Sequence, residues 1–229
     1  MRKIFNRSSF YIIFALLVFS AAITYVDAFV HPPYFSKIPI KILFFLVLPL
    51  FYFVLNKQAF ADFKALFRPK RKGLGLSLLL GLGIYAVITG GYFLTRSFFD
   101  FSAVTGTLEA GMGITKDNFL YVALYISVMN SFLEEFFFRG FGFIIMKKYT
   151  TRTFAYIFSP VLFAFYHAGM TLGMFDVLLT VIVMAGLVCG GIIFNFLNEK
   201  NGNIYSSWFT HMFANFAINT VGFVLFSAK

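Results

Sequence analysis

Residues 119–146 read FLYVALYISVMNSFLEEFFFRGFGFIIM, and this stretch decides how the chain folds. It is long enough to cross a bilayer as one helix, because a span needs about 20 apolar residues. Two adjacent acids, Glu134 and Glu135, and one base, Arg139, lie within it. Ionisable side chains at membrane depth are costly and usually serve a function. We therefore expect a membrane helix that carries part of a functional site.

The composition is that of a polytopic membrane protein. Of the 229 residues, 60% are hydrophobic, 12% are charged and 36 are phenylalanine, and the mean hydropathy is +0.84. Apolar runs occupy residues 9–29, 40–56, 74–95, 119–146, 153–170, 175–197 and 204–226. They are continuously apolar rather than alternating, which favours helices over a β-barrel. The predicted fold is an all-α membrane protein, a polytopic bundle of about seven transmembrane helices around an intramembrane cavity.

We expect one integral domain, with residues 1–118 supplying N-terminal transmembrane helices and a basic amphipathic cytoplasmic loop. The first apolar run could instead be a cleaved signal peptide, but its length and the lack of a convincing cleavage site favour a retained helix. The single cysteine, Cys189, cannot form an intrachain disulfide, so the fold relies on packing.

Lysine and arginine positions predict the orientation, because these residues collect on the cytoplasmic side of a membrane. One side would carry Arg2, Lys3, Arg7, Lys57, Lys64, Arg68, Lys70, Arg71, Lys72, Lys147, Lys148, Arg152 and Lys200. The other side would carry Lys37, Lys41, Arg96, Lys116 and Lys229. The amino terminus is therefore expected in the cytoplasm. The net charge of +10 indicates this topology and attraction to anionic lipid rather than nucleic-acid binding.

Three further segments have patterns of their own. In residues 57–72, KQAFADFKALFRPKRK, the apolar side chains share one helical face, which indicates a helix at the cytoplasmic interface or a basic connector anchored by its neighbours. The connection 96–118 is the longest on the opposite side and could be a lid or a plain loop. Gly186 and Gly190 form a GxxxG pair, followed by Gly191, and these small residues predict close packing of the helices around the cavity.

The spacing of the charged residues in 119–146 suggests separate roles. Glu135 and Arg139 are four residues apart and can pair along one helical face. Glu134 points about 100° away from Glu135, so it is the better candidate to face a cavity. The alternative interpretation is a buried ion network that only clamps helices together.

Two later apolar runs each contain a histidine. Phe163 and His167 are four residues apart, and so are His211 and Asn215. Taken alone, a histidine of this kind is more often a core residue than a catalytic one, and asparagine commonly bridges membrane helices. Glu134 and His167 both lie roughly 20 Å from the cytoplasmic surface at 1.5 Å per residue, whereas His211 would lie only about 10 Å deep. Helix tilt, or an earlier helix start, would have to close that difference.

Three motifs resemble those of a known family. EEFFFR at 134–139, FAFYH at 163–167 and HMFAN at 211–215 look like the motifs EExxxR, FxxxH and HxxxN of the CAAX protease and bacteriocin-processing (CPBP or Abi) family of intramembrane proteases. The glycine-rich run and Asn-Gly turn before the third motif also resemble the family. The resemblance covers about residues 119–220, and it implies that residues 119–229 are the catalytic helices of the same integral domain.

The resemblance implies an intramembrane endopeptidase that hydrolyses a peptide bond of a membrane-associated peptide or protein. Glu134 would activate water as a general base. His167 would help to hold the water, while His211 and Asn215 would donate hydrogen bonds to the developing oxyanion.

The same resemblance implies supporting roles for other residues. Glu135 and Arg139 would orient the site electrostatically, and Phe163 would pack beside His167, because a phenyl ring offers no acid–base chemistry. No cofactor is favoured. Zinc stays possible, because Glu134, His167 and His211 could form a His₂Glu set with Glu135 as the base. The zincin motif HExxH is absent, and Glu135 already has Arg139 as a partner. We therefore favour the metal-free, glutamate-dependent mechanism.

Two other classes of function compete with the protease. A non-catalytic membrane regulator or bacteriocin-immunity protein could keep this fold and bind a partner through its spans. A small transporter is the less favoured alternative, because intramembrane charges also mark ion pathways. The expected partners are a membrane-associated substrate and the lipid bilayer, with no nucleic acid. The expected location is a bacterial cell membrane, on size and family grounds.

Overall fold

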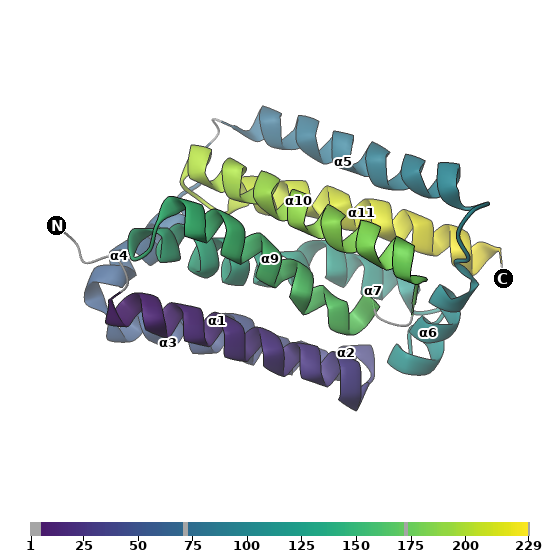
Figure 1. Cartoon of the computed structure of the whole chain (residues 1–229), viewed down its shortest axis with the longest axis horizontal. Helices are drawn as coiled ribbons and strands as arrows, with labels where there is room; N and C mark the ends of the chain where they lie inside the picture. Colours follow the sequence, from purple (N-terminus) through teal and green to yellow (C-terminus); the bar gives the residue numbers. More distant parts are fainter. Residues whose placement is uncertain (1–5, 71–72, 172–173, 229) are drawn as a thin grey trace.

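The computed structural model describes residues 6–70, 73–171 and 174–228, and its helices lie side by side along one direction (Figure 1). In this part of the chain, seven helices are long and apolar enough to cross a membrane. They are Arg7–Val30, Tyr34–Leu55, Leu74–Thr95, Phe119–Lys148, Arg152–Thr171, Val177–Asn201 and Tyr205–Ser227. The predicted all-α bundle is confirmed. The main difference is the second span, which begins at Tyr34, six residues before the expected start at 40.

The spans are built from shorter elements. The first contains α1 (Arg7–Tyr25) and η1 (Val26–Val30), and the second contains α2 (Tyr34–Ile42), η2 (Leu43–Val47) and α3 (Leu48–Leu55). Then come α4 (Lys57–Leu66), α5 (Leu74–Thr95) and α6 (Ser102–Met112). The central span contains α7 (Phe119–Tyr125), η3 (Ile126–Asn130), α8 (Ser131–Glu134), η4 (Glu135–Ile145) and η5 (Met146–Lys148). The last three are α9 (Arg152–Thr171), α10 (Val177–Asn201) and α11 (Tyr205–Ser227).

Polar residues mark several of the helix ends. Asn6 caps α1 by accepting a hydrogen bond from Ser9 N at 3.1 Å, and Asp176 caps α10 by accepting one from Leu179 N at 2.9 Å. Such caps satisfy amide groups that have no partner within the helix. Gly202 comes directly after α10 at φ +65°, a conformation that favours glycine, and thereby ends the helix.

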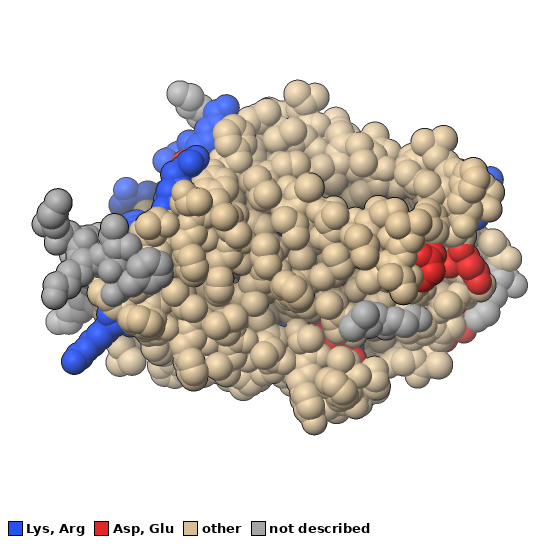
Figure 2. Space-filling model, in the orientation of Figure 1, with Lys and Arg blue, Asp and Glu red and all other residues tan. Residues whose placement is uncertain are grey.

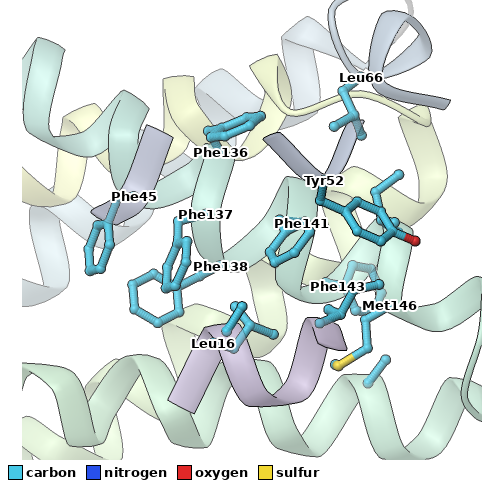
Figure 3. Close-up of a cluster of buried hydrophobic side chains, with 14 of the residues drawn as sticks. Leu16, Phe45, Tyr52, Leu66, Phe136, Phe137, Phe138, Phe141, Phe143 and Met146 are labelled. Atoms are coloured by element: carbon cyan, nitrogen blue, oxygen red, sulfur yellow. The ribbon is translucent and has the colours of Figure 1, made fainter. Parts of the chain in front are cut away.

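An aromatic core surrounds η4, the π-helical segment of the central span (Figure 3). Phe137 of η4 stacks on Phe45 of η2 at 4.2 Å between ring centroids, and Phe138 meets Phe163 of α9 at 5.2 Å. Leu16 of α1 joins the same cluster. Both halves of the chain therefore contribute to this core, and the residues that begin η4 lie at the centre of the bundle.

Charge is distributed unevenly between the two ends of the bundle. On the face drawn in Figure 2, lysine and arginine gather at the end where the chain begins, and acids gather mainly at the opposite end. The two termini lie at opposite ends (Figure 1). Lys37 and Lys41 were assigned to the less basic side, Lys37 before the second apolar run and Lys41 at its start. In the structure both belong to α2 and are largely buried. Arg2, Lys3, Arg71, Lys72 and Lys229, which also entered the orientation argument, lie outside the described residues.

The basic segment after the second span forms α4 and then packs against the bundle. Phe63 and Phe67 contact Phe136 of η4 at 6.2 and 6.0 Å between ring centroids. The Leu66 carbonyl accepts a hydrogen bond from Ile204 N at 3.2 Å, so α4 also covers the turn before α11. The connection 96–118, for which a lid or a plain loop was expected, contains the helix α6.

The glycines of α10 differ from the expectation. A Cβ added at Gly186 or Gly190 would meet nothing within 4 Å, so this GxxxG pair brings no neighbouring helix close. At Gly191 an added Cβ would lie 2.7 Å from Pro160 Cβ. The close approach of α9 and α10 therefore occurs at Gly191, because α10 turns this residue, and not the GxxxG pair, toward α9.

Candidate active site

Glu134, the last residue of α8, lies inside the bundle with 2% of its surface exposed. Its Oε1 accepts hydrogen bonds from Lys41 Nζ at 3.0 Å, Asn130 Nδ2 at 2.8 Å and Tyr166 OH at 3.1 Å. Its Oε2 lies 3.7 Å from His211 Nε2. One oxygen thus has three donors, while the other faces an imidazole.

Glu135 and His211 form a second buried contact. Glu135 Oε1 lies 2.9 Å from His211 Nδ1, and Arg139 Nη1 lies 3.4 Å from the same oxygen. Glu135 and Arg139 are both 0% exposed. The pairing of these two residues is the one that their four-residue spacing indicates. Because a carboxylate only accepts, Nδ1 of His211 carries a proton toward Glu135, and Nε2 is the ring atom that faces Glu134.

The guanidinium of Arg139 is held between aromatic rings. Its central carbon lies 4.0 Å from the Phe163 ring centroid and 5.1 Å from that of Phe194. A cation over a ring face is attracted by the ring quadrupole, and more strongly where water is excluded. A Cβ added at Gly191 would lie 3.1 Å from Arg139 Nη2, so the glycine also leaves room for this side chain.

His167 is oriented by its own helix. Its Nδ1 lies 2.8 Å from the Phe163 carbonyl oxygen, which can only accept, so Nδ1 carries the proton and Nε2 is the free acceptor. Its ring packs against Phe163 at 4.5 Å and Tyr166 at 4.7 Å. Tyr166, against which the His167 ring packs, donates a hydrogen bond to Glu134 Oε1 at 3.1 Å, so His167 and Glu134 share a neighbour. Phe163 therefore supports His167 on one side and Arg139 on the other.

Asn215 lies one turn beyond His211 and connects two helices. Its Nδ2 donates a hydrogen bond to the Ile126 carbonyl at 3.1 Å, which joins α11 to η3. This bond uses one of the two amide hydrogens and leaves the other for a second acceptor. Asn219, one turn further, makes similar bonds to Ala123 O and Ser127 Oγ.

The depth difference for His211 is closed by the turn before α11, and not by an earlier helix start. The helix begins at Tyr205, one residue later than expected. Asn203 and Ile204 in the preceding turn are only 1% and 0% exposed, because α4 covers them. The turn is therefore packed inside the protein, and His211 reaches Glu134, with 3.7 Å between Nε2 and Oε2.

Sequence reasoning missed three residues at this site: Lys41, Asn130 and Tyr166. Asn130 precedes Glu134 by four residues and Tyr166 adjoins His167, so helical spacing could have indicated both. Lys41 comes from a distant span, and the only available signal was a lysine at the start of the apolar run 40–56. It contacts Glu134 because α2 begins earlier than expected and carries Lys41 into the bundle.

The zinc alternative does not fit the arrangement of these side chains. In the described part of the chain, no three His, Cys, Asp or Glu residues are grouped so that they could hold a metal ion. The Lys41 ammonium, 3.0 Å from Glu134 Oε1, would repel a divalent cation at that carboxylate.

Comparison with protein families gave one match. Residues 116–217 match the family described as type II CAAX prenyl endopeptidase Rce1-like. No curated protein and no solved structure matched the chain. The matched residues include Glu134, Glu135, Arg139, Phe163, His167, His211 and Asn215, and they exclude Lys41.

Proposed function

We propose that the protein hydrolyses a peptide bond of a membrane-associated peptide or protein, with Glu134 as the base, because residues 116–217 match the family of type II CAAX prenyl endopeptidase Rce1-like proteins. The family match confirms the resemblance found in the three motifs. The general class is a CAAX-type protease in an integral membrane protein. One observation supports the catalytic assignment above the others: Glu134 Oε2 lies 3.7 Å from His211 Nε2, while Glu134 Oε1 is fully engaged.

The two facing atoms are suited to hold the attacking water. A water molecule roughly 2.8 Å from both Glu134 Oε2 and His211 Nε2 would lie to one side of the line that joins them. With His211 in its doubly protonated form, Nε2 would donate to the water oxygen, and the two water hydrogens would bond to Glu134 Oε2 and to Nε2 of His167. Glu134 would then remove one proton as the water oxygen bonds to the peptide carbonyl carbon.

The remaining groups stabilise the tetrahedral intermediate that this attack forms. The second amide hydrogen of Asn215 would donate to the oxyanion, and so would the Nε2 proton of His211, which the ring keeps throughout the reaction. The proton taken up by Glu134 passes to the leaving amine nitrogen as the carbon–nitrogen bond breaks, which restores the carboxylate. Glu135 and Arg139 keep the His211 ring in the required orientation.

An apolar groove near the site favours a substrate with a hydrophobic anchor. It has a volume of about 340 Å³ and lies between α9 and α10. Its lining consists of Val161, Ala164, Phe165, Thr180, Val181, Met184, Ala185 and Val188. Ala164 is three residues from His167, so the groove begins one helical turn from the proposed site. We propose that the lipid-like part of the substrate lies here.

Orientation and location are part of the proposal. The basic end of the bundle would face the cytoplasm, which places the amino terminus there. A bacterial cell membrane is the proposed setting, on size and family grounds.

The decisive experiment compares membrane peptides in cells that carry the protein, its Glu134→Gln variant or its Glu199→Gln variant. Glu199 is the matched control, because it makes bonds to Arg152, Lys147 and Tyr156 at the basic end instead of at the site. Cleavage should disappear with Glu134→Gln and persist with Glu199→Gln. If Glu134→Gln, His167→Ala and His211→Ala all preserve cleavage, the assignment is wrong. Ion flux without any cleavage would favour a transporter instead.

A further inference from the structure

Among the described residues, Lys41 supplies the only amino group that contacts the Glu134 carboxylate, which is the proposed base. Its Nζ lies 3.0 Å from Glu134 Oε1 and also donates to Asn130 Oδ1. The side chain is 15% exposed. It lies over the Tyr166 ring at 5.1 Å from the centroid. A lysine this deeply placed is tolerated because its charge is paired and hydrogen-bonded.

The contact affects how the carboxylate is oriented. Lys41, Asn130 and Tyr166 all donate to one oxygen, and they approach it from three elements, α2, η3 and α9. A carboxylate with three donors on Oε1 cannot exchange its two oxygens by rotation without breaking these bonds. Oε2 is thereby kept toward His211.

We propose that Lys41 is a positioning residue for the hydrolysis: its ammonium holds Oε1 of Glu134, so that Oε2 is the atom that takes the proton from water. The inference rests on the proposed function. Lys41 lies outside residues 116–217, so the family match does not assign it any role. The N-terminal spans thus complete a site whose other residues come from the second half of the chain.

The chain offers a matched control on the same helix. Lys37, one turn before Lys41, pairs with Asp27 at 2.7 Å, and both side chains are about as buried as those of the Lys41–Glu134 pair. Lys37 and Asp27 are not part of the proposed mechanism. Replacing both with uncharged residues of similar size removes a buried ion pair without touching Glu134.

The experiment measures kcat and KM in detergent, on a peptide that the unsubstituted protein cleaves. Lys41→Met should lower kcat at least tenfold and change KM less than threefold, because the substitution alters the base and not substrate binding. Lys41→Arg keeps the charge and should retain more of kcat than Lys41→Met. The double variant Asp27→Asn/Lys37→Met should keep kcat within twofold. An unchanged kcat in Lys41→Met, or a loss seen only in KM, would overturn the inference.

Two measurements separate failure of the inference from failure of the proposed function. If Glu134→Gln still cleaves, the proposed function is wrong and the inference falls with it. If Glu134→Gln is inactive while Lys41→Met is fully active, only the inference is wrong. Melting temperatures test the contact without any substrate: Lys41→Met should lower the melting temperature less in the Glu134→Gln background than in the unsubstituted protein. Equal shifts in both backgrounds would overturn the positioning role even if Lys41→Met is too unstable to assay.

Discussion

Removing the charge of Arg139 should strongly destabilise the bundle. In Arg139→Met, Glu135 keeps His211 as a partner but loses the buried cation 3.4 Å away. Breaking a buried ion pair from one side costs about 3–5 kcal/mol, and the contacts with Phe163 and Phe194 add up to about 2 kcal/mol where water is excluded. A methionine recovers about 0.3–1.5 kcal/mol through its own contacts with these rings. We therefore expect a net loss of roughly 4 kcal/mol in the free energy of unfolding.

The assay is chemical unfolding in detergent micelles, followed by the fluorescence of Trp208. This residue is the single tryptophan of the chain, and it bonds through Nε1 to Val128 O at 3.0 Å between α11 and η3. Arg152→Met is the control, because Arg152 is 67% exposed and its loss should hardly change stability.

The double variant Glu135→Gln/Arg139→Met tests the cause of the loss. It removes both charges, so its cost should fall below the sum of the two single costs by about 1–3 kcal/mol. Strictly additive costs would refute the argument, since they would mean that Glu135 and Arg139 stabilise the fold independently.

Three further outcomes are expected. Gly191→Ala should destabilise the protein by about 1–3 kcal/mol in the same unfolding assay, because its new methyl group would lie 2.7 Å from Pro160 Cβ. In Gly186→Ala the new methyl group meets open space, so this variant should be neutral or stabilising. Ala185 lines the apolar groove. Ala185→Phe should raise KM for a lipid-anchored peptide and leave KM unchanged for the same peptide without its anchor. Equal effects on both peptides would show that the groove does not bind the substrate. Cleavage by the purified protein should persist after treatment with a metal chelator. If the chelator abolished cleavage and added zinc restored it, Glu134 would be a metal ligand and not the base.

Helical spacing and hydropathy predicted a large part of the fold and some of the site. Apolar runs predicted seven spans, because a helix that crosses lipid must satisfy its own backbone over about 20 residues. The four-residue spacing of Glu135 and Arg139 indicated their pairing, and it depends only on one helix. The catalytic roles of Glu134, His167, His211 and Asn215 stay predictions.

Contacts between segments that are distant in the sequence could not be predicted from local sequence patterns. The GxxxG pair of α10 indicated close packing, yet the neighbouring helix meets Gly191, since the rotation of a helix about its axis is set by all of its neighbours. His211 seemed too shallow because its depth was counted from a surface turn, whereas that turn is buried beneath α4.

The amino-acid sequence by itself predicted an integral membrane protein with about seven helices long and apolar enough to cross the bilayer, and it placed the acids and imidazoles within those apolar runs. These properties depend on the transfer of side chains into lipid and on regular helix geometry, which act within one segment. Only the tertiary structure decided that Lys41 reaches Glu134 and that His211 lies between two carboxylates. Those contacts depend on how separate helices rotate and slide against one another, which is settled by packing over the whole bundle.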